Sequence, residues 1–265
     1  MSGKVNRRKL LVGAGSAGLV ASSGVAPAYA QNKRRLKMVT TWPKNFPGVG
    51  TAAESVAKRV EAMSEGELKI KVFAAGELVG AFEALDAVST GSADLYHGAD
   101  YYWQGKDPAY NFFTTWPMGM TATEFYSWIE FGGGQAFWDE LATKFKVKPF
   151  VCGDTGTQSG GWFTKKIETL DDLKGLRMRM PGLGGEVIRR LGALPVVLSG
   201  GEIFQSLQSG AIDATEWIGP WNDQAFGFYQ IAKYFYAPGF HEPNAALTLG
   251  INLDVWGSLK PAHQE

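Results

Sequence analysis

The sequence predicts an α/β protein with two similar lobes, and three observations support this. Segments with strand and helix periodicity alternate along the chain, which is typical of folds built around parallel sheets. The strand–helix order starts again after residue 155. The segment VSTGSAD at Val88–Asp94 aligns without gaps to LQSGAID at Leu207–Asp213, and in both a predicted helix ends at a glycine before a strand. We therefore expect a ligand cleft between the lobes, near the carboxyl ends of the strands.

The first lobe is predicted over residues 31–155. Residues at helical or alternating spacing define most of its elements. A further helical stretch runs over Glu124–Phe145, and the glycines at 132–134 are expected to bend or split it. The expected strands are Leu36–Trp42, Leu68–Ala74, Ala93–Gly98 and Val147–Thr155, and the other helices are Thr51–Met63 and Phe82–Ser89.

The second lobe is predicted over residues 156–220. Its expected strands are Gly160–Lys166, Leu176–Met180, Leu194–Ser199 and Asp213–Gly219, and its helices are Gly184–Ala193 and Gly201–Gly210. Residues 221–265 are expected to link the lobes. They comprise a crossover helix near Asn222–Ala232 and two extended runs, Tyr234–Phe240 and Ala246–Val255.

Composition limits the functions that this chain can have. The 265 residues carry 26 Lys and Arg against 26 Asp and Glu, so no excess of positive charge points to a nucleic-acid partner. Cys152 is the single cysteine, which rules out an intrachain disulfide and a cysteine-based metal cluster. The three histidines lack zinc-ligand spacing, and the sequence contains neither G-x-S-x-G nor a P-loop.

Residues 1–30 are predicted to be a twin-arginine export signal that is cleaved. Four basic residues, including Arg7 and Arg8, precede the apolar run Leu10–Val25 and the small-residue site Ala28–Ala30. The alternative is a retained membrane anchor. It is disfavoured because the run is glycine-rich and shorter than the roughly 20 apolar residues of a membrane span. Cleavage would leave an exported soluble protein with a small excess of acidic residues.

The export segment also contains a fortuitous nucleotide-binding pattern. Gly13–Gly18 reads GAGSAG and fits the dinucleotide fingerprint G-x-G-x-x-G. That fingerprint also requires an acidic residue about 20 positions further on, to hold the ribose. The first acidic residue of the chain is Glu54, so we reject this interpretation.

Two arginines and a glutamine are the first candidate binding groups. Arg177 and Arg179 alternate with methionines in LRMRM, so both lie on one face of a short strand. That face is either exposed to solvent, or one arginine points into the cleft, where its planar fork would hold a carboxylate. Gln158 lies in the glycine-rich segment GTQSGG at a predicted lobe crossover, which is otherwise a plain linker.

Two acidic motifs are the remaining candidates. EWIGPWND begins with Glu216 and Trp217 at the end of a predicted strand, where Trp217 either contacts a ligand or belongs to the core. FHEPN places His241 and Glu242 before a proline at another crossover, where the alternative is a surface turn.

The stretches RMRMPGLGGEVIRRLGA and GGEIFQSLQSGAIDATEWIGPWND resemble the solute-binding proteins of tripartite ATP-independent periplasmic (TRAP) transporters. Within that family the chain most resembles the branch that binds 2-oxo acids and related hydroxy acids. The resemblance begins near Lys37 and is densest over Gln158–Glu242. It implies a two-lobed periplasmic binding protein that closes by a hinge, catalyses no reaction and delivers its ligand to a membrane permease. Family members continue into a mostly helical C-terminal part, which is expected to be missing from this sequence.

The resemblance also implies a set of site residues. Arg179 would pair with the ligand carboxylate, and Arg177 would lie nearer the outer end of the strand. A bridging cation, sodium in some members and calcium in others, would be held by Gln158, Glu216, the Trp217 carbonyl and Glu242. Such oxygen donors suit a hard cation on general grounds. The acid would also be contacted by Gln158 and Trp217 and, from the first lobe, by Tyr102.

Two other interpretations remain open at this point. An exported enzyme acting on small carboxylic acids would use Glu216 and Glu242 as acid and base. A truncated copy would bind nothing. The sequence does not specify which 2-oxo or hydroxy acid is bound, which of the two cations is used, or whether the protein forms a homodimer.

Overall fold

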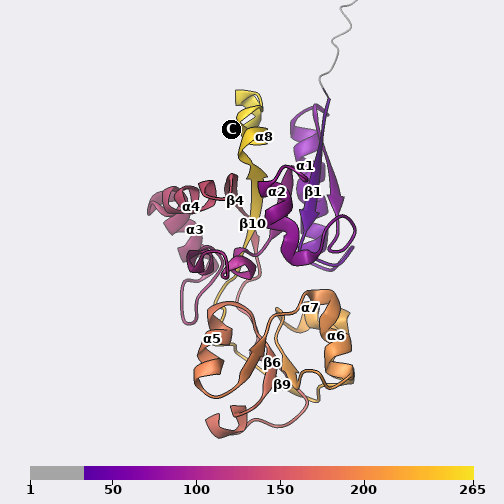
Figure 1. Cartoon of the computed structure of the whole chain (residues 1–265), viewed down its shortest axis with the longest axis vertical. Helices are drawn as coiled ribbons and strands as arrows, with labels where there is room; N and C mark the ends of the chain where they lie inside the picture. Colours follow the sequence, from indigo (N-terminus) through magenta and orange to yellow (C-terminus); the bar gives the residue numbers. More distant parts are fainter. Residues whose placement is uncertain (1–32) are drawn as a thin grey trace, which may run out of the picture. The chain divides into compact units, whose positions relative to one another are not determined.

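The computed structural model describes residues 33–265 (Figure 1). The predicted export signal at residues 1–30 lies outside the described residues. Two five-stranded sheets organise the described part, with strand orders β2-β1-β3-β10-β4 and β7-β6-β8-β5-β9. We call the elements around the first sheet the first lobe and those around the second sheet the second lobe. Over residues 33–265, no helix combines the length and apolar character that a membrane span requires.

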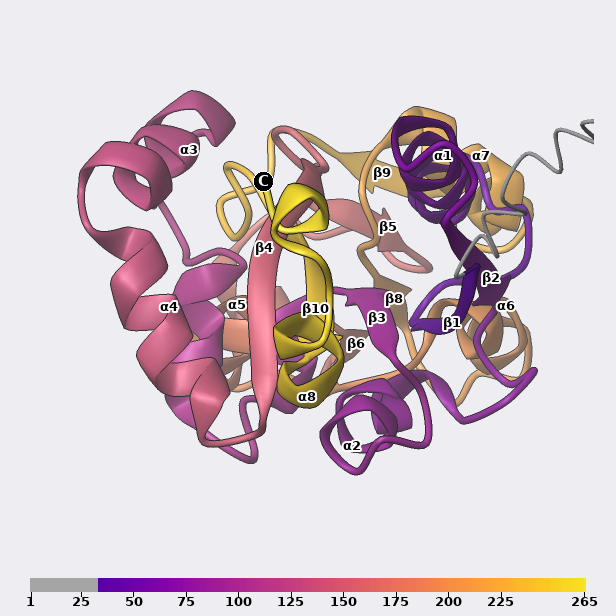
Figure 2. The same cartoon turned by 90° about the horizontal axis from the view of Figure 1, so that it is seen from above.

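The first sheet is mixed. Strand β1 (Arg34–Thr40) pairs in parallel with β2 (Leu68–Phe73) and β3 (Leu95–Gly98). Strand β10 (Ala246–Asn252) inserts antiparallel between β3 and β4 (Val147–Asp154), and Figure 2 shows β10 alongside β4. The helices of this lobe are α1 (Val49–Met63), α2 (Ala84–Ser89), α3 (Ala122–Phe131), α4 (Gly134–Thr143) and α8 (Leu253–Gly257).

One expectation for the first lobe is confirmed and one boundary differs. The glycines at 132–134 split the stretch Glu124–Phe145 into α3 and α4, because Gly133 adopts a left-handed φ of 82° between them. The extended run Ala246–Val255 ends at Asn252. The Asn252 side chain accepts hydrogen bonds from the Asp254 and Val255 N–H groups and thereby starts α8.

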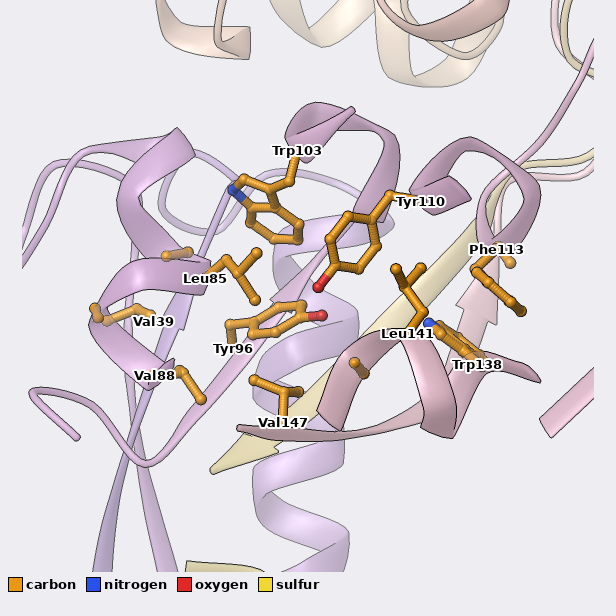
Figure 3. Packing of buried hydrophobic residues seen from close by; sticks show 14 of the residues in the cluster. Val39, Leu85, Val88, Tyr96, Trp103, Tyr110, Phe113, Trp138, Leu141 and Val147 are labelled. Carbon is orange, nitrogen blue, oxygen red and sulfur yellow. The ribbon is translucent and has the colours of Figure 1, made fainter. Parts of the chain in front are cut away.

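An aromatic core fixes the end of β3, which leads to the candidate site. Trp138 is fully buried and stacks on Phe113 with ring centroids 5.2 Å apart (Figure 3). It donates a hydrogen bond of 2.9 Å to Asp100. Tyr96 donates a second bond of 2.9 Å to the same carboxylate. Burial raises the pKa of Asp100 to about 6. This network anchors the short 3-10 turn Asp100–Trp103, which carries Tyr102.

The second sheet is built from short strands. Strand β6 (Arg177–Arg179) pairs in parallel with β7 (Leu194–Val196) and β8 (Ala214–Thr215). Strand β5 (Gly161–Phe163) is antiparallel to β8 and β9 (Tyr234–Tyr236). The helices of this lobe are α5 (Gly182–Arg190), α6 (Gly200–Gln208) and α7 (Pro220–Phe226).

Several predicted boundaries in the second lobe were wrong. The expected strand Asp213–Gly219 contracts to β8, because the chain leaves the sheet at Glu216. The expected helix Asn222–Ala232 begins instead at Pro220 and ends at Phe226, where Gly227 takes a left-handed φ of 75°. The run Tyr234–Phe240 pairs only to Tyr236, since Pro238 has no N–H to continue a ladder.

The chain passes between the two sheets through a pair of adjacent segments, residues 155–160 and 237–245. Thr155 N–H donates to the Ala245 carbonyl over 3.0 Å, and Gln158 N–H donates to the Glu242 carbonyl over 3.0 Å. Gln158 and Glu242 are therefore neighbours in the connection between the sheets. The division of the chain into lobes at residues 155 and 220 remains a prediction.

Candidate functional site

The two arginines of β6 lie in different environments. Arg177 is exposed and forms a two-pronged ion pair with Asp213, over 2.9 Å from Nε and 2.7 Å from Nη2. Arg179 is only 1% exposed. The shared face of the strand is thus open to solvent at Arg177 and covered at Arg179, where the sheet approaches the first lobe. One arginine is buried, and it is the one that the resemblance selects.

Arg179 contacts both lobes. Its Nη1 pairs with the fully buried carboxylate of Glu216, and its Nη2 donates to the Tyr102 hydroxyl of the first lobe over 3.2 Å. The guanidinium lies 4.9 Å from the ring centroid of Trp217, within cation–π range. Burial lowers the pKa of Arg179, but the nearby acidic groups, Glu216 first, raise it above its ordinary value. The group is therefore a permanent buried cation.

Trp217 belongs to an aromatic cluster that joins the lobes. Its ring meets Trp42 and Phe46 of the first lobe edge-on, with centroids 6.1 Å and 6.0 Å apart. It also contacts Phe226 of α7 at 5.2 Å. Trp217 thus packs in a core and lines the site at once, so the two interpretations of this residue are compatible.

The side chains of two glutamates and one histidine converge beside Arg179. Glu216, His241 and Glu242 are each at most 2% exposed, and one ligand atom from each lies within 4.8 Å of the others. His241 Nε2 is 3.4 Å from a Glu216 carboxylate oxygen. The FHEPN segment is consequently buried around these two residues and is not a surface turn. His241 did not enter the predicted ligand set because only the packing of β8 against this segment brings it to Glu216.

The electrostatics of this cluster favour an added positive charge. Burial, and next the Glu216 charge, raise the pKa of Glu242 to about 8. Burial lowers the pKa of His241, but hydrogen bonding and charge from Glu216 outweigh it and raise the value overall. Two buried carboxylates with one arginine form a site in which a further cation would relieve unpaired negative charge.

Oxygen acceptors without partners support the same interpretation. Within the described residues, Gln158 Oε1 and Glu242 Oε2 are buried without a hydrogen-bond partner. Nor does any hydrogen bond over residues 33–265 reach the Trp217 carbonyl oxygen. A buried acceptor left unpaired is unfavourable by about 1–3 kcal/mol. Amide, carboxylate and carbonyl oxygens are the donors preferred by sodium- and calcium-like cations, so the chemistry of the site fits such an ion.

The space between the lobes at this site is small. Its volume is about 10 Å³, the scale needed for one water molecule. Residues from both lobes line it, among them Trp42, Tyr101, Tyr102, Thr155, Gln158 and Trp217. An organic acid therefore reaches Arg179 only if the lobes separate or the lining side chains rearrange. Of these six lining residues, Trp42, Tyr101 and Thr155 were not singled out by the sequence motifs.

The raised pKa of Glu242 predicts a pH dependence. The unfolded chain releases this proton near the ordinary pKa of 4.5, whereas the folded cation-free protein keeps it to about pH 8. The stabilisation from this group is therefore complete below about pH 4.5 and is lost as pH rises through about 8. A bound cation must displace the proton, so calcium affinity should rise between about pH 6 and pH 8, with release of about one proton at neutral pH. Calorimetry in buffers of different ionisation enthalpy measures this release; affinity independent of pH would contradict it.

Comparisons with known proteins agree with this geometry. Residues 38–265 match the model of the bacterial extracellular solute-binding protein family 7. A monocarboxylate 2-oxoacid-binding periplasmic protein from Nostoc sp. is 47% identical over 231 residues, which cover 87% of this chain and 63% of that relative. The chain thus spans less than two thirds of the length of this curated relative.

Solved structures of TRAP periplasmic solute-binding proteins are similar over most of the chain. One from Pseudoalteromonas atlantica, with bound sodium and pyruvate, is 42% identical with a TM-score of 0.85, covering 88% of this chain and 70% of that one. One from Colwellia psychrerythraea, with bound calcium and pyruvate, is 41% identical with a TM-score of 0.84 and the same coverages of 88% and 70%. A third, from Bordetella bronchiseptica, is a dimer with copurified calcium and picolinate, 39% identical with a TM-score of 0.85, covering 87% of this chain and 68% of that one.

Proposed function

The chain belongs to the bacterial extracellular solute-binding protein family 7, and from that membership we propose that it is the periplasmic solute-binding subunit of a TRAP transporter. Its ligand is a small 2-oxo or 2-hydroxy monocarboxylate, captured together with a sodium or calcium ion. The observation that carries this proposal is the buried Arg179 beside Glu216 and Glu242, between two lobes that leave little space. Relatives more than 40% identical hold pyruvate with sodium or with calcium.

Each residue of the site has a proposed role. Arg179 pairs with the ligand carboxylate through its planar fork. Trp217 shapes the apolar side of the pocket. Tyr102 reaches the ligand from the first lobe, and its bond to Arg179 couples binding to closure of the lobes.

The cation site uses Gln158, Glu216, the Trp217 carbonyl and Glu242. These residues would hold the ion, whose positive charge would offset the two buried carboxylates beside the ligand. Gln158 and Glu242 lie side by side in the crossing segments, with their backbones joined over 3.0 Å. Two of the four proposed cation donors thus lie in the connection about which the lobes would turn.

Location and partners follow from the same membership. We propose export by the twin-arginine route with cleavage after Ala30, and delivery of the ligand to the TRAP membrane permease subunits. A homodimer is also proposed, because a relative 39% identical forms a dimer. The enzyme alternative with Glu216 and Glu242 as acid and base is set aside, since the family is one of solute-binding proteins.

Tryptophan fluorescence tests the proposed function. The full chain is treated with a chelator to remove bound metal. It is then titrated with pyruvate, first without a cation and then with added calcium or sodium. We expect a saturable change that requires the cation, because Trp217 lines the site and contacts Trp42 across the lobes. Thermal stabilisation should reach about 2.7 kcal/mol at a ligand concentration about 100 times the dissociation constant. Propionate, which lacks the 2-oxo group, serves as the control. A folded protein that responds to none of pyruvate, lactate and longer 2-oxo acids would refute the proposal.

A further inference from the structure

Asp223 is a buried acidic residue that the proposed function leaves unused. It lies in the first turn of α7 and is 1% exposed. Its Oδ1 accepts hydrogen bonds from the N–H groups of Ile218 and Gly219, each over 3.1 Å. Its Oδ2 accepts a bond of 2.8 Å from the indole of Trp162 in β5. Because both oxygens have partners, Asp223 is held firmly and is not itself a free ligand for a cation.

The bond to Ile218 N–H determines the direction of the preceding carbonyl. The Ile218 N–H and the Trp217 C=O belong to one peptide unit, and in a trans peptide they point in opposite directions. Over residues 33–265, the only cis peptide is Ala237–Pro238, so this unit is trans. With the N–H turned toward Asp223, the Trp217 oxygen must point away from Asp223. That oxygen accepts no hydrogen bond from the described residues.

The next peptide unit is fixed as well. The Ile218 carbonyl accepts a bond of 2.9 Å from the Ser159 N–H, and the Gly219 N–H of the same unit donates to Asp223. Two consecutive peptide planes are therefore fixed by hydrogen bonds at both Ile218 and Gly219. Among residues 33–265 the Trp217 oxygen has no hydrogen-bond donor, and it follows directly after Glu216.

We infer that Asp223 is a positioning residue that aims the Trp217 carbonyl oxygen into the cation site; this inference rests on the proposed function. A charged acceptor bonds an N–H more strongly than a neutral one, so the carboxylate resists rotation of the peptide. Some residues do not contact a metal but hold one of its ligands in place by a hydrogen bond. Removing such a residue typically lowers metal affinity by about 10- to 100-fold. A purely structural alternative is that Asp223 only stabilises the N-terminus of α7.

Two substitutions in the full chain separate these roles. Asp223→Ala removes the acceptor for the Ile218 N–H and should lower calcium affinity, at saturating pyruvate, by about 10- to 100-fold. Trp162→Phe removes only the Oδ2 partner and should leave calcium affinity within about threefold, although it also removes a buried hydrogen bond. Asp223→Asn, whose amide oxygen still accepts both N–H bonds, should restore most of the affinity. Calcium affinity unchanged in a folded Asp223→Ala protein would overturn the inference.

A measurement on the unsubstituted protein can overturn the inference even if Asp223→Ala does not fold. Coordination by the Trp217 carbonyl draws electron density from its peptide, so the Ile218 amide nitrogen resonance should move downfield when calcium and pyruvate bind. The Gly219 amide is the matched control, because its peptide carbonyl already bonds Ser159, and its nitrogen should move much less. Equal shifts, or no shift at Ile218 in a protein saturated with calcium, would overturn the inference. A protein that binds neither calcium nor sodium with pyruvate would instead refute the proposed function and, with it, this inference.

Discussion

Pyruvate binding should be abolished when Arg179 is replaced by alanine. The Arg179 guanidinium is 1% exposed, so a ligand carboxylate beside it would lose its water and depend on the charge of Arg179. Removing one member of such a buried charge pair lowers affinity by about 2–5 kcal/mol, which corresponds to roughly 30- to 4,000-fold. Calorimetric titration with pyruvate at saturating calcium measures the loss.

Arg177→Ala is the matched control for this experiment. Arg177 lies two residues earlier on the same strand, but it is exposed and paired with Asp213, so pyruvate affinity should not change. Arg179→Ala also leaves Glu216 buried without its partner, and the free energy of unfolding should fall by about 3–5 kcal/mol. Arg179→Lys, which keeps the charge but loses the fork, tests binding in a less perturbed protein. A folded Arg179→Ala protein that binds pyruvate with unchanged affinity would contradict the assignment.

Glu242→Gln should greatly weaken cation binding. Glu242 is 2% exposed and its Oε2 has no partner among residues 33–265, so the substitution preserves shape while deleting one of two carboxylate donors. We expect calcium affinity to fall by at least about 100-fold, in line with a loss of about 3 kcal/mol for one buried charge pair. The pH dependence of calcium binding between about pH 6 and pH 8 should disappear with it.

Stability distinguishes this variant from the arginine variant. Because burial and the Glu216 charge already disfavour ionised Glu242, the cation-free Glu242→Gln protein should be as stable as the parent, or slightly more so, above about pH 8. Glu140→Gln in α4, which alters an exposed carboxyl, is the control and should leave calcium binding unchanged. If Glu242→Gln binds calcium as tightly as the parent, Glu242 is not a cation ligand.

The sequence predicted the α/β class and most elements because their signals are local. The helix at Val49–Met63 and the strand at Leu68–Phe73 follow from periodicity alone. The residues at which helices and strands begin and end were harder to predict. The glycines around Gly133 predicted the α3–α4 break correctly, whereas the start of α8 at Asn252 was hidden inside a longer extended pattern.

The candidate site depended on contacts that no local pattern contains. Arg177 and Arg179 have the same alternation, and only the approach of the first lobe to one end of β6 makes Arg179 the buried member. The choice of Gln158, Glu216 and Glu242 came from family resemblance, and their roles remain predictions. His241 and Asp223 stood inside the quoted motifs, yet their importance rests on hydrogen bonds to Glu216 and Ile218 that spacing does not reveal.

The position of β10 has a consequence for how the chain reaches its native state. The second lobe is continuous in sequence, so all of its strand pairings form within one segment of the chain, and a bond of 3.0 Å between Thr155 and Ala245 holds its two ends together. The first sheet is different, because β10 fills the place between β3 and β4 only after the whole second lobe has been synthesised. Until then β3 and β4 each present an unpaired edge, which is prone to association with other chains. Slow docking of β10 would therefore reduce the yield of protein by aggregation without altering any residue that touches the ligand.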